Sequence, residues 1–288
     1  MTIAVTVKVH DGIVFASDSA STMIVRDGNG NSAVQNVYNN ANKIFNLRKG
    51  LPIGAITYGT GSIGAASIST LAKDVRRRFT GDDQDHLDWK LIEAEYTVEQ
   101  VATSVRAFLF EEKHAEHLAQ GGPPADKFGF WVGGYSARSR QSELWQIEIT
   151  NGQCEAPIKL RGEGETGINW AGQPEALQRL VLGISMALPV MLSQMGLPQE
   201  AVTNVMTTLR ANMDAQLLSS PMPIQDAIDL ARFLVETTIG YARFSPGAPT
   251  VGGPIEIAAV TKHEHFKWVD RKHYFSTVLN PKGGQEHE

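Results

Sequence analysis

The first eighteen residues carry the pattern that most constrains how this chain folds. Over residues 3–9 apolar side chains occupy every second position, which is the period of a half-buried strand. Residues 10–12, His-Asp-Gly, supply a tight turn, and residues 13–16 form a second apolar strand. We therefore expect an antiparallel hairpin whose open end brings Thr2 close to Asp18.

Further strand signals recur along the chain. The polar stretch 19–42 contains the turn sequence Asp-Gly-Asn-Gly-Asn at 27–31, which predicts a short surface hairpin or loop. The remaining strand predictions are the pair 42–47 with 53–58, the pair 128–135 with 143–150, and the final segments 255–261 and 266–269.

Helical periodicity separates these strands. One helix is predicted over 63–79, where basic residues gather near the end, and another opens at Thr97 with a capping pattern. Three more are predicted over 172–192, 199–218 and 223–243. Strands, helices, strands, helices and strands in this order favour antiparallel sheets flanked by helices, an α+β fold or a four-layer αββα sandwich.

Length and composition narrow the class of protein. The chain of 288 residues has room for one large domain or two small ones, and no repeat or linker divides it. We therefore interpret residues 1–288 as a single domain. The net charge of -5 gives no basic excess, so nucleic acid is not an expected partner.

Compartment follows from the cysteine count and from the absence of targeting patterns. Cys154 is the single cysteine, so it forms no internal disulfide, and this fits a reducing compartment. The start of the chain lacks the features of a secretory signal, and the apolar window 180–197 is broken by Pro189. We expect a cytoplasmic protein without a membrane segment.

Thr2 is the strongest candidate for chemistry. Initiator methionine is removed before small residues such as threonine, and this removal would make Thr2 N-terminal. Its α-amino group, with a reference pKa of about 7.7 to 8.0, could then take the proton of its own hydroxyl. Nucleophile and base would reside in one residue, a recognised way to activate a hydroxyl. The alternative is an ordinary start of a strand.

The front of the chain resembles the β subunit of the proteasome, and the sequence is similar to bacterial proteasome homologues among the N-terminal nucleophile (Ntn) hydrolases. The matching segments are 2–3 (TI), 11–19 (DGIVFASDS), 42–45 (NKIF), 53–59 and, more loosely, 128–135, the helix from Asp226, and 252–261. The likeness covers most of the chain and is most specific in the first sixty residues. It implies the αββα fold of Ntn hydrolases.

The resemblance also implies roles for four residues. Thr2 would attack an amide carbonyl, Lys43 would place positive charge beside the reacting oxygen, and Asp18 would hold Lys43. The backbone N–H of Gly59 would donate to the oxyanion. The alternative for Asp18 and Lys43 is a solvated surface ion pair. The implied substrate is a peptide or another amide, with no cofactor and no metal ion.

The second half of the chain departs from the family pattern. Ala171-Gly172 stands where the family has a serine before a glycine at the start of a helix, and Pro249 and Gly252 stand where it has an aspartate and a serine. Without those groups, proton transfer would fall to water, Ser245 or Thr250. A second hypothesis is therefore a proteasome-like scaffold subunit that oligomerises without hydrolysis.

Assembly is a further expectation of the resemblance. The chain is longer than a usual subunit, and we assign the excess to helical insertions near 82–96 and 182–220. Residues 182–197 carry more apolar surface than one amphipathic face buries against a sheet, which favours a contact between subunits. The expected assembly is a homo-oligomer larger than a dimer, such as a ring. The sequence does not identify an unfoldase partner.

Other candidate sites carry weaker signals. His114 with His117, and His263 with His265, lack a third ligand at a diagnostic spacing, so we interpret them as solvated side chains. The glycine-containing turn 59–62 lacks the lysine of a phosphate-binding loop. Cys154 has no neighbouring histidine to activate its thiol.

Overall fold

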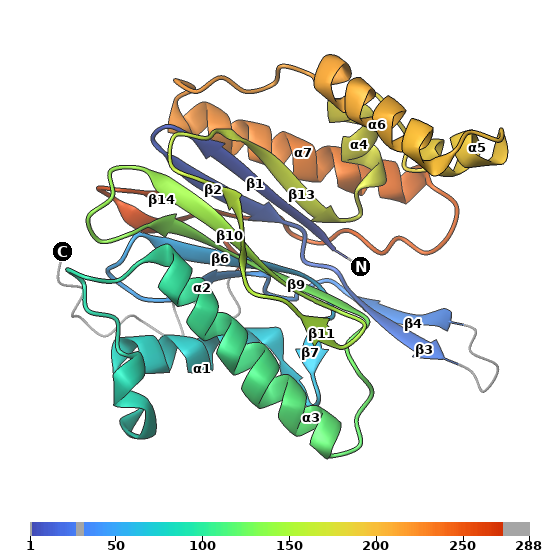
Figure 1. The fold of residues 1–288 in the computed structure, drawn as a ribbon. Coiled ribbons are helices and arrows are strands. Elements are labelled where there is room, and N and C mark those ends of the chain that lie inside the picture. Colours follow the sequence, from blue (N-terminus) through green and yellow to red (C-terminus); the bar gives the residue numbers. More distant parts are fainter. Residues whose placement is uncertain (1, 27–31, 273–288) are drawn as a thin grey trace.

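A computed structural model describes residues 2–26 and 32–272, and its centre is a pair of antiparallel sheets (Figure 1). The first sheet has the strand order β13-β1-β2-β14-β15. Its strands are β1 (Ile3–Val9), β2 (Gly12–Ser17), β13 (Gly167–Gly172), β14 (Glu256–Thr261) and β15 (His265–Asp270). Strands β1 and β2 pair as the predicted antiparallel hairpin, with Ala4 opposite Ser17.

The second sheet has the order β11-β10-β9-β6-β5, with β12 pairing on β10. Its strands are β5 (Ile44–Asn46), β6 (Ile53–Gly59), β9 (Lys127–Tyr135), β10 (Ser142–Thr150), β11 (Gln153–Cys154) and β12 (Ile158–Arg161). Two small hairpins stand apart from both sheets: β3 (Ser21–Arg26) with β4 (Ser32–Tyr38), and β7 (Ser62–Ile63) with β8 (Ala66–Ser67).

Helices cover the outer face of each sheet. Helix α7 (Ile224–Phe244) packs on β1 and β2 beside α4 (Glu175–Leu182), and α5 (Leu188–Gln194) and α6 (Gln199–Met213) adjoin α4 at one corner. On the second sheet lie α1 (Ile68–Thr80), the 3₁₀ segment η1 (Gln84–Trp89) and α2 (Val98–Arg106). Helix α2 continues through a π-helical stretch, η2 (Ala107–His114), into α3 (Ala115–Ala119).

Three buried apolar clusters hold these parts together. One lies between α7 and the first sheet and contains Leu234 and Val5; another lies between α2 and the second sheet and contains Phe108. The third lies between the two sheets, where Phe15 of the first sheet meets Trp131 of the second. Each sheet therefore has apolar side chains on both faces.

This packing corrects the expectation of a half-buried first strand. All seven residues of β1 are buried, including Thr6 and Lys8, because the second sheet covers the face that alternation left polar. The Lys8 ammonium is accommodated by the carbonyls of Gly162, at 3.0 Å, and Glu165. The alternation of apolar and polar residues in β1 correctly indicates which side chains face the helices, but it does not indicate which side chains are exposed.

Two helix predictions were wrong at their starts. Helix α1 begins at Ile68 rather than at residue 63, because Gly64 adopts φ 59° and the Ser67 side chain caps the helix by accepting the Thr70 N–H. Gly172, the first residue of the predicted helix 172–192, instead ends strand β13, which pairs with β1 and was not predicted. The predicted helix 172–192 is further divided at Gly183, which ends α4 with φ 66°.

The other predicted elements are confirmed within a few residues. These are the pairs β5 with β6, β9 with β10 and β14 with β15, the hairpin of β3 with β4, and the helices α2, α6 and α7. Thr97 caps α2 by accepting the N–H of Gln100. Helices and antiparallel sheets occur as expected for an α+β fold. The turn predicted at 27–31 and the end of the chain lie outside the described residues.

Candidate active site

Thr2 lies directly before β1 and is 5% exposed. The neighbouring end of β13 encloses its backbone, since Gly172 pairs with Ile3. A Cβ added at Gly172 would lie 1.9 Å from the carbonyl oxygen of Thr2, and φ at Gly172 is 99°. Only glycine fits this position without displacing the start of β1.

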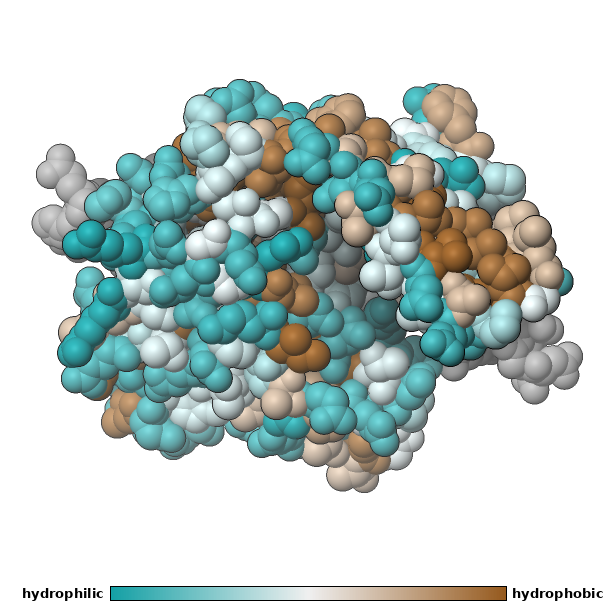
Figure 2. Space-filling view, turned by 45° about the horizontal axis from the view of Figure 1, so that its top comes forward, coloured by the Kyte–Doolittle hydropathy of each residue, from teal (hydrophilic) through white to brown (hydrophobic). Residues whose placement is uncertain are grey.

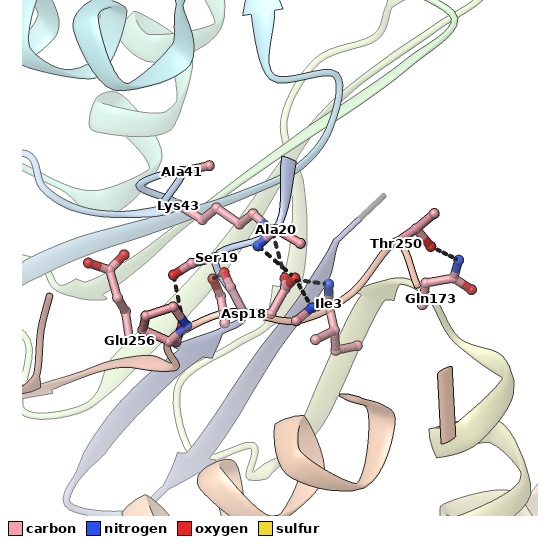
Figure 3. Close-up of polar contacts among 12 residues, drawn as sticks. Ile3, Asp18, Ser19, Ala20, Ala41, Lys43, Gln173, Thr250 and Glu256 are labelled. Carbon is pink, nitrogen blue, oxygen red and sulfur yellow. Dashed lines mark hydrogen bonds and ion pairs between the residues drawn. The ribbon is translucent and has the colours of Figure 1, made fainter. Parts of the chain in front are cut away.

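Asp18 follows β2 and is fully buried. Its Oδ1 accepts the N–H of Ile3 at 3.0 Å, and its Oδ2 accepts the N–H groups of Ala20 and Gly252, each at 3.0 Å (Figure 3). Three backbone donors from three separate segments thus converge on one carboxylate. Hydrogen bonds of this kind offset the cost of burying a polar group.

Lys43 precedes β5, and its ammonium is the fourth partner of that carboxylate. Its Nζ lies 2.6 Å from Asp18 Oδ1, and Lys43 is 4% exposed. The alternative of a solvated surface pair is therefore wrong. Burial lowers the pKa of Lys43, while the negative charge of Asp18 opposes that shift. Because the pKa is lowered, the Lys43 ammonium releases its proton more easily than a solvated lysine.

Gly59 ends β6 with φ 85°, and a Cβ there would lie 2.4 Å from the carbonyl oxygen of Lys127. The β6 segment adjoins Lys43, because the N–H of Thr57 donates to the Lys43 carbonyl at 2.9 Å. The sequence-predicted residues thus come from the ends of neighbouring strands, with Thr2 and Asp18 on the first sheet and Lys43 and Gly59 on the second.

A second buried ion pair, which the sequence analysis did not predict, lies close to Asp18 and Lys43. Lys272 Nζ is 3.0 Å from Glu256 Oε2, and it donates at 2.6 Å to both the Ser19 hydroxyl and the Ala41 carbonyl. Ser19 follows Asp18, and Ala41 stands two residues before Lys43. Lys272 therefore ties together the two segments that carry the first pair. Burial lowers its pKa, and the charge of Glu256 opposes that change.

The sequence held one signal for this pair. Glu256 is a single carboxylate inside an apolar strand, and it is 1% exposed. A charge in such a position requires a buried partner. The sequence spacing could not identify Lys272 as the partner of Glu256. Lys272 follows the next strand, and its contact with Ala41 exists only in the folded chain.

The structure also locates the residues at which the sequence departs from the proteasome pattern. Ala171 lies in β13 opposite Ala4, rather than at the start of a helix. Gly252 contributes its backbone N–H to Asp18, a role that needs no side chain. Thr250 is buried, and its hydroxyl accepts a hydrogen bond from Gln173 at 3.3 Å (Figure 3).

Other candidate residues stay outside this cluster. His114 was expected to be solvated, but it is buried, and its Nε2 accepts the N–H of Ala125 at 3.2 Å. Burial lowers its pKa. Burial also raises the pKa of the Cys154 thiol, which keeps it protonated. Across residues 2–26 and 32–272 no three His, Cys, Asp or Glu side chains gather to hold a metal ion.

Comparison with known proteins gives a likeness in structure. No family model matches the sequence, and no curated protein matches it. Among solved structures, the chain is similar to the Anbu (Gly-1) mutant from Hyphomicrobium sp. strain MC1. The TM-score is 0.52 at 16% identity, over 94% of this chain and 86% of the other. The two chains therefore share a fold.

Within the described part of the chain, none of the helices combines the length and the apolar character needed to cross a bilayer.

The Glu256–Lys272 pair generates a stability prediction. Glu256→Gln leaves the Lys272 ammonium buried without its carboxylate, and we expect a loss of about 3 kcal/mol in the free energy of unfolding. Glu256→Gln with Lys272→Met removes both charges and should recover much of that loss. Denaturant unfolding measures the free energy of unfolding of both variants.

Glu116→Gln, which breaks the exposed pair with Lys113, is the control and should cost no more than about 1 kcal/mol. A wild-type unfolding free energy for Glu256→Gln would contradict the analysis.

Proposed function

We propose that the protein is a threonine-type amidohydrolase or endopeptidase of the Ntn class, in which Thr2 acts as nucleophile after removal of Met1. The observation that carries this proposal is the bridge through Asp18. One buried carboxylate receives the Lys43 ammonium at 2.6 Å and the N–H of Ile3 at 3.0 Å, so it links the lysine to the residue that follows Thr2.

The fold supports the same proposal. Helices pack on the first sheet, the two sheets contact each other, and helices pack on the second sheet, which is consistent with the proposed four-layer αββα sandwich of Ntn hydrolases. The likeness to the Anbu structure is consistent with it at the level of fold. We assign residues 1–288 to one such domain, with the helical regions near 82–96 and 182–220 as insertions.

The proposed reaction uses groups of the chain and water. The Thr2 hydroxyl loses its proton to the free α-amino group and attacks the substrate carbonyl, forming a bond between Oγ and carbon. The Lys43 ammonium stabilises negative charge near Oγ, and the Gly59 N–H donates to the oxyanion. Breakage of the C–N bond releases an amine that takes the proton. Water then cleaves the ester and restores Thr2.

A catalytically silent scaffold is the second candidate. Two observations favour it: Ala171, opposite Ala4, carries no hydroxyl, and Gly252 reaches Asp18 with its backbone alone. In this alternative the Asp18–Lys43 pair holds the two sheets together, and the apolar surface of residues 182–197 serves assembly. Both candidates would act in the cytoplasm, and neither involves nucleic acid or a membrane.

Assembly into a homo-oligomer is part of the proposal. Residues 182–197 do not form one helix, and the apolar side chains of α5 divide between two surroundings. Leu188 and Leu192 pack toward Val202 and Met206 of α6, whereas Val190 and Met191 are more than half exposed, as is Met195. Figure 2 shows the resulting hydrophobic surface at this corner. An apolar surface of this kind favours burial against another subunit.

Thr2→Ala tests the nucleophile. We expect this substitution to abolish hydrolysis of fluorogenic peptides while the protein stays folded, because it removes the attacking hydroxyl together with a single methyl group. Thr2→Ser keeps the hydroxyl and the amine and should retain part of the activity. Intact-mass measurement of the native protein is the accompanying control, since retained Met1 would block the amine and exclude the hydrolase. Equal turnover by Thr2→Ala would also exclude it.

Lys43→Ala tests the electrostatic role. Loss of one preorganised positive group in a buried site should lower kcat about a hundredfold or more. Asp18 keeps three backbone donors in this variant, so the fold should persist. Lys113→Ala removes an exposed lysine and should leave kcat unchanged. A Lys43→Ala protein that loses stability but keeps its rate would identify a purely structural lysine.

Light scattering tests assembly. We expect a mass well above that of a dimer at micromolar concentration, where the monomer is 31.4 kDa. Met191→Glu places a charge in the exposed apolar surface and should shift the mass toward the monomer, because burying an unpaired charge is costly. Ile158→Glu alters an equally exposed apolar residue of β12 and should have no effect. A monomeric wild-type protein would remove the proposed assembly.

A further inference from the structure

A basic cavity lies at the edge of the second sheet, next to the segments that carry Lys43 and Lys272. It has a volume of about 460 Å³ and is bounded by β5, α1 and β15. Five cationic side chains line it, two from β15 and its end, two from α1 and one from the turn after β5: Lys267, Arg271, Lys73, Arg76 and Lys49. Among the described residues, no carboxylate lines this cavity. A chain with a net charge of -5 thus concentrates positive charge at one place.

Within the described residues none of the five cations forms an ion pair. The guanidinium of Arg271 lies 4.6 Å from the ring centre of Trp268, which is a contact with a neutral group. Glu264 is close enough to Lys267 to interact with its charge, but its carboxylate hydrogen-bonds to Thr261 and does not line the cavity.

Two guanidinium groups line the cavity from different elements. Arg76 comes from α1 and Arg271 from the end of β15, and the charge of Arg271 adds to the effect of burial in lowering the pKa of Arg76. Like charges that share one cavity repel each other. A ligand carrying negative charge would relieve that repulsion and gain charge-assisted hydrogen bonds.

We propose that this cavity binds a compact polyanion, a small molecule bearing two or more linked phosphate groups. Guanidinium groups match phosphate geometry with paired N–H donors, and lysine adds positive charge at longer reach. Asn46 of β5 and Ser69 of α1 add neutral polar groups to the lining. The volume lies in the range of small-molecule sites. Free oligophosphate and the phosphate chain of a nucleotide share this chemistry.

Calorimetric titration of the full chain with tripolyphosphate tests the proposal. We expect saturable binding that weakens as salt rises. Arg76→Gln with Arg271→Gln should weaken it about tenfold or more, because two charged hydrogen-bond donors are lost. Arg138→Gln with Arg140→Gln removes the same charge from an exposed loop and should bind as the wild type does. ATP binding that tripolyphosphate displaces would identify a nucleotide, and binding of tripolyphosphate alone would identify a free oligophosphate.

Thermal unfolding guards against a folding defect in the double variant. Without ligand, Arg76→Gln with Arg271→Gln should unfold at the same temperature as the wild type or higher, since repulsion is removed. Lys73→Gln with Lys267→Gln changes two exposed residues, one on each wall, and should also weaken binding. Absence of tripolyphosphate binding would overturn the proposal. So would unchanged binding by both cavity variants, or binding of heparin alone, which would indicate a surface for a macromolecule.

Discussion

The arrangement of the candidate site depends on the hydrogen bonds and the ion pair that the carboxylate of Asp18 accepts. It receives backbone N–H groups from the start of β1, from the segment after β2 and from the loop before β14, together with the ammonium of Lys43. A fully buried carboxylate without donors would be strongly destabilising, and one with four donors fixes the positions of all four segments. Thr2 is held in place because the residue that follows it is one of those donors.

The second ion pair extends this network and changes its electrostatics. Lys272 and Glu256 bring another cation and another anion into the same region, and Lys272 contacts the neighbours of both Asp18 and Lys43. Four charges of alternating sign cost less to bury together than separately, because each is solvated by the others. Lys272, at the end of the described chain, therefore helps to position the segments near Ser19 and Ala41 by non-covalent contacts.

Much of the fold followed from local patterns, and the failures arose from long-range pairing or from an overlooked turn. The β1–β2 hairpin, the strand pairs of the second sheet and helix α2 could be predicted because periodicity and capping residues act over short distances. Strand β13 was missed because it pairs with β1, more than 150 residues earlier, and short-range patterns contain no information on such pairing. The start of α1 was misplaced because apolar spacing alone ignored the turn at Gly64.

For the candidate site, the sequence by itself determined which chemical groups are available: a threonine at position 2, an aspartate at the end of the hairpin and a lysine before the next strand. Only the tertiary structure decided that Asp18 and Lys43 are buried together at 2.6 Å, that Glu256 and Lys272 stand behind them, and that five cations share one cavity. The physical reason is that burial and charge pairing depend on which strands become neighbours. That choice is made by packing across the whole sheet, over separations at which the linear order of residues carries no signal.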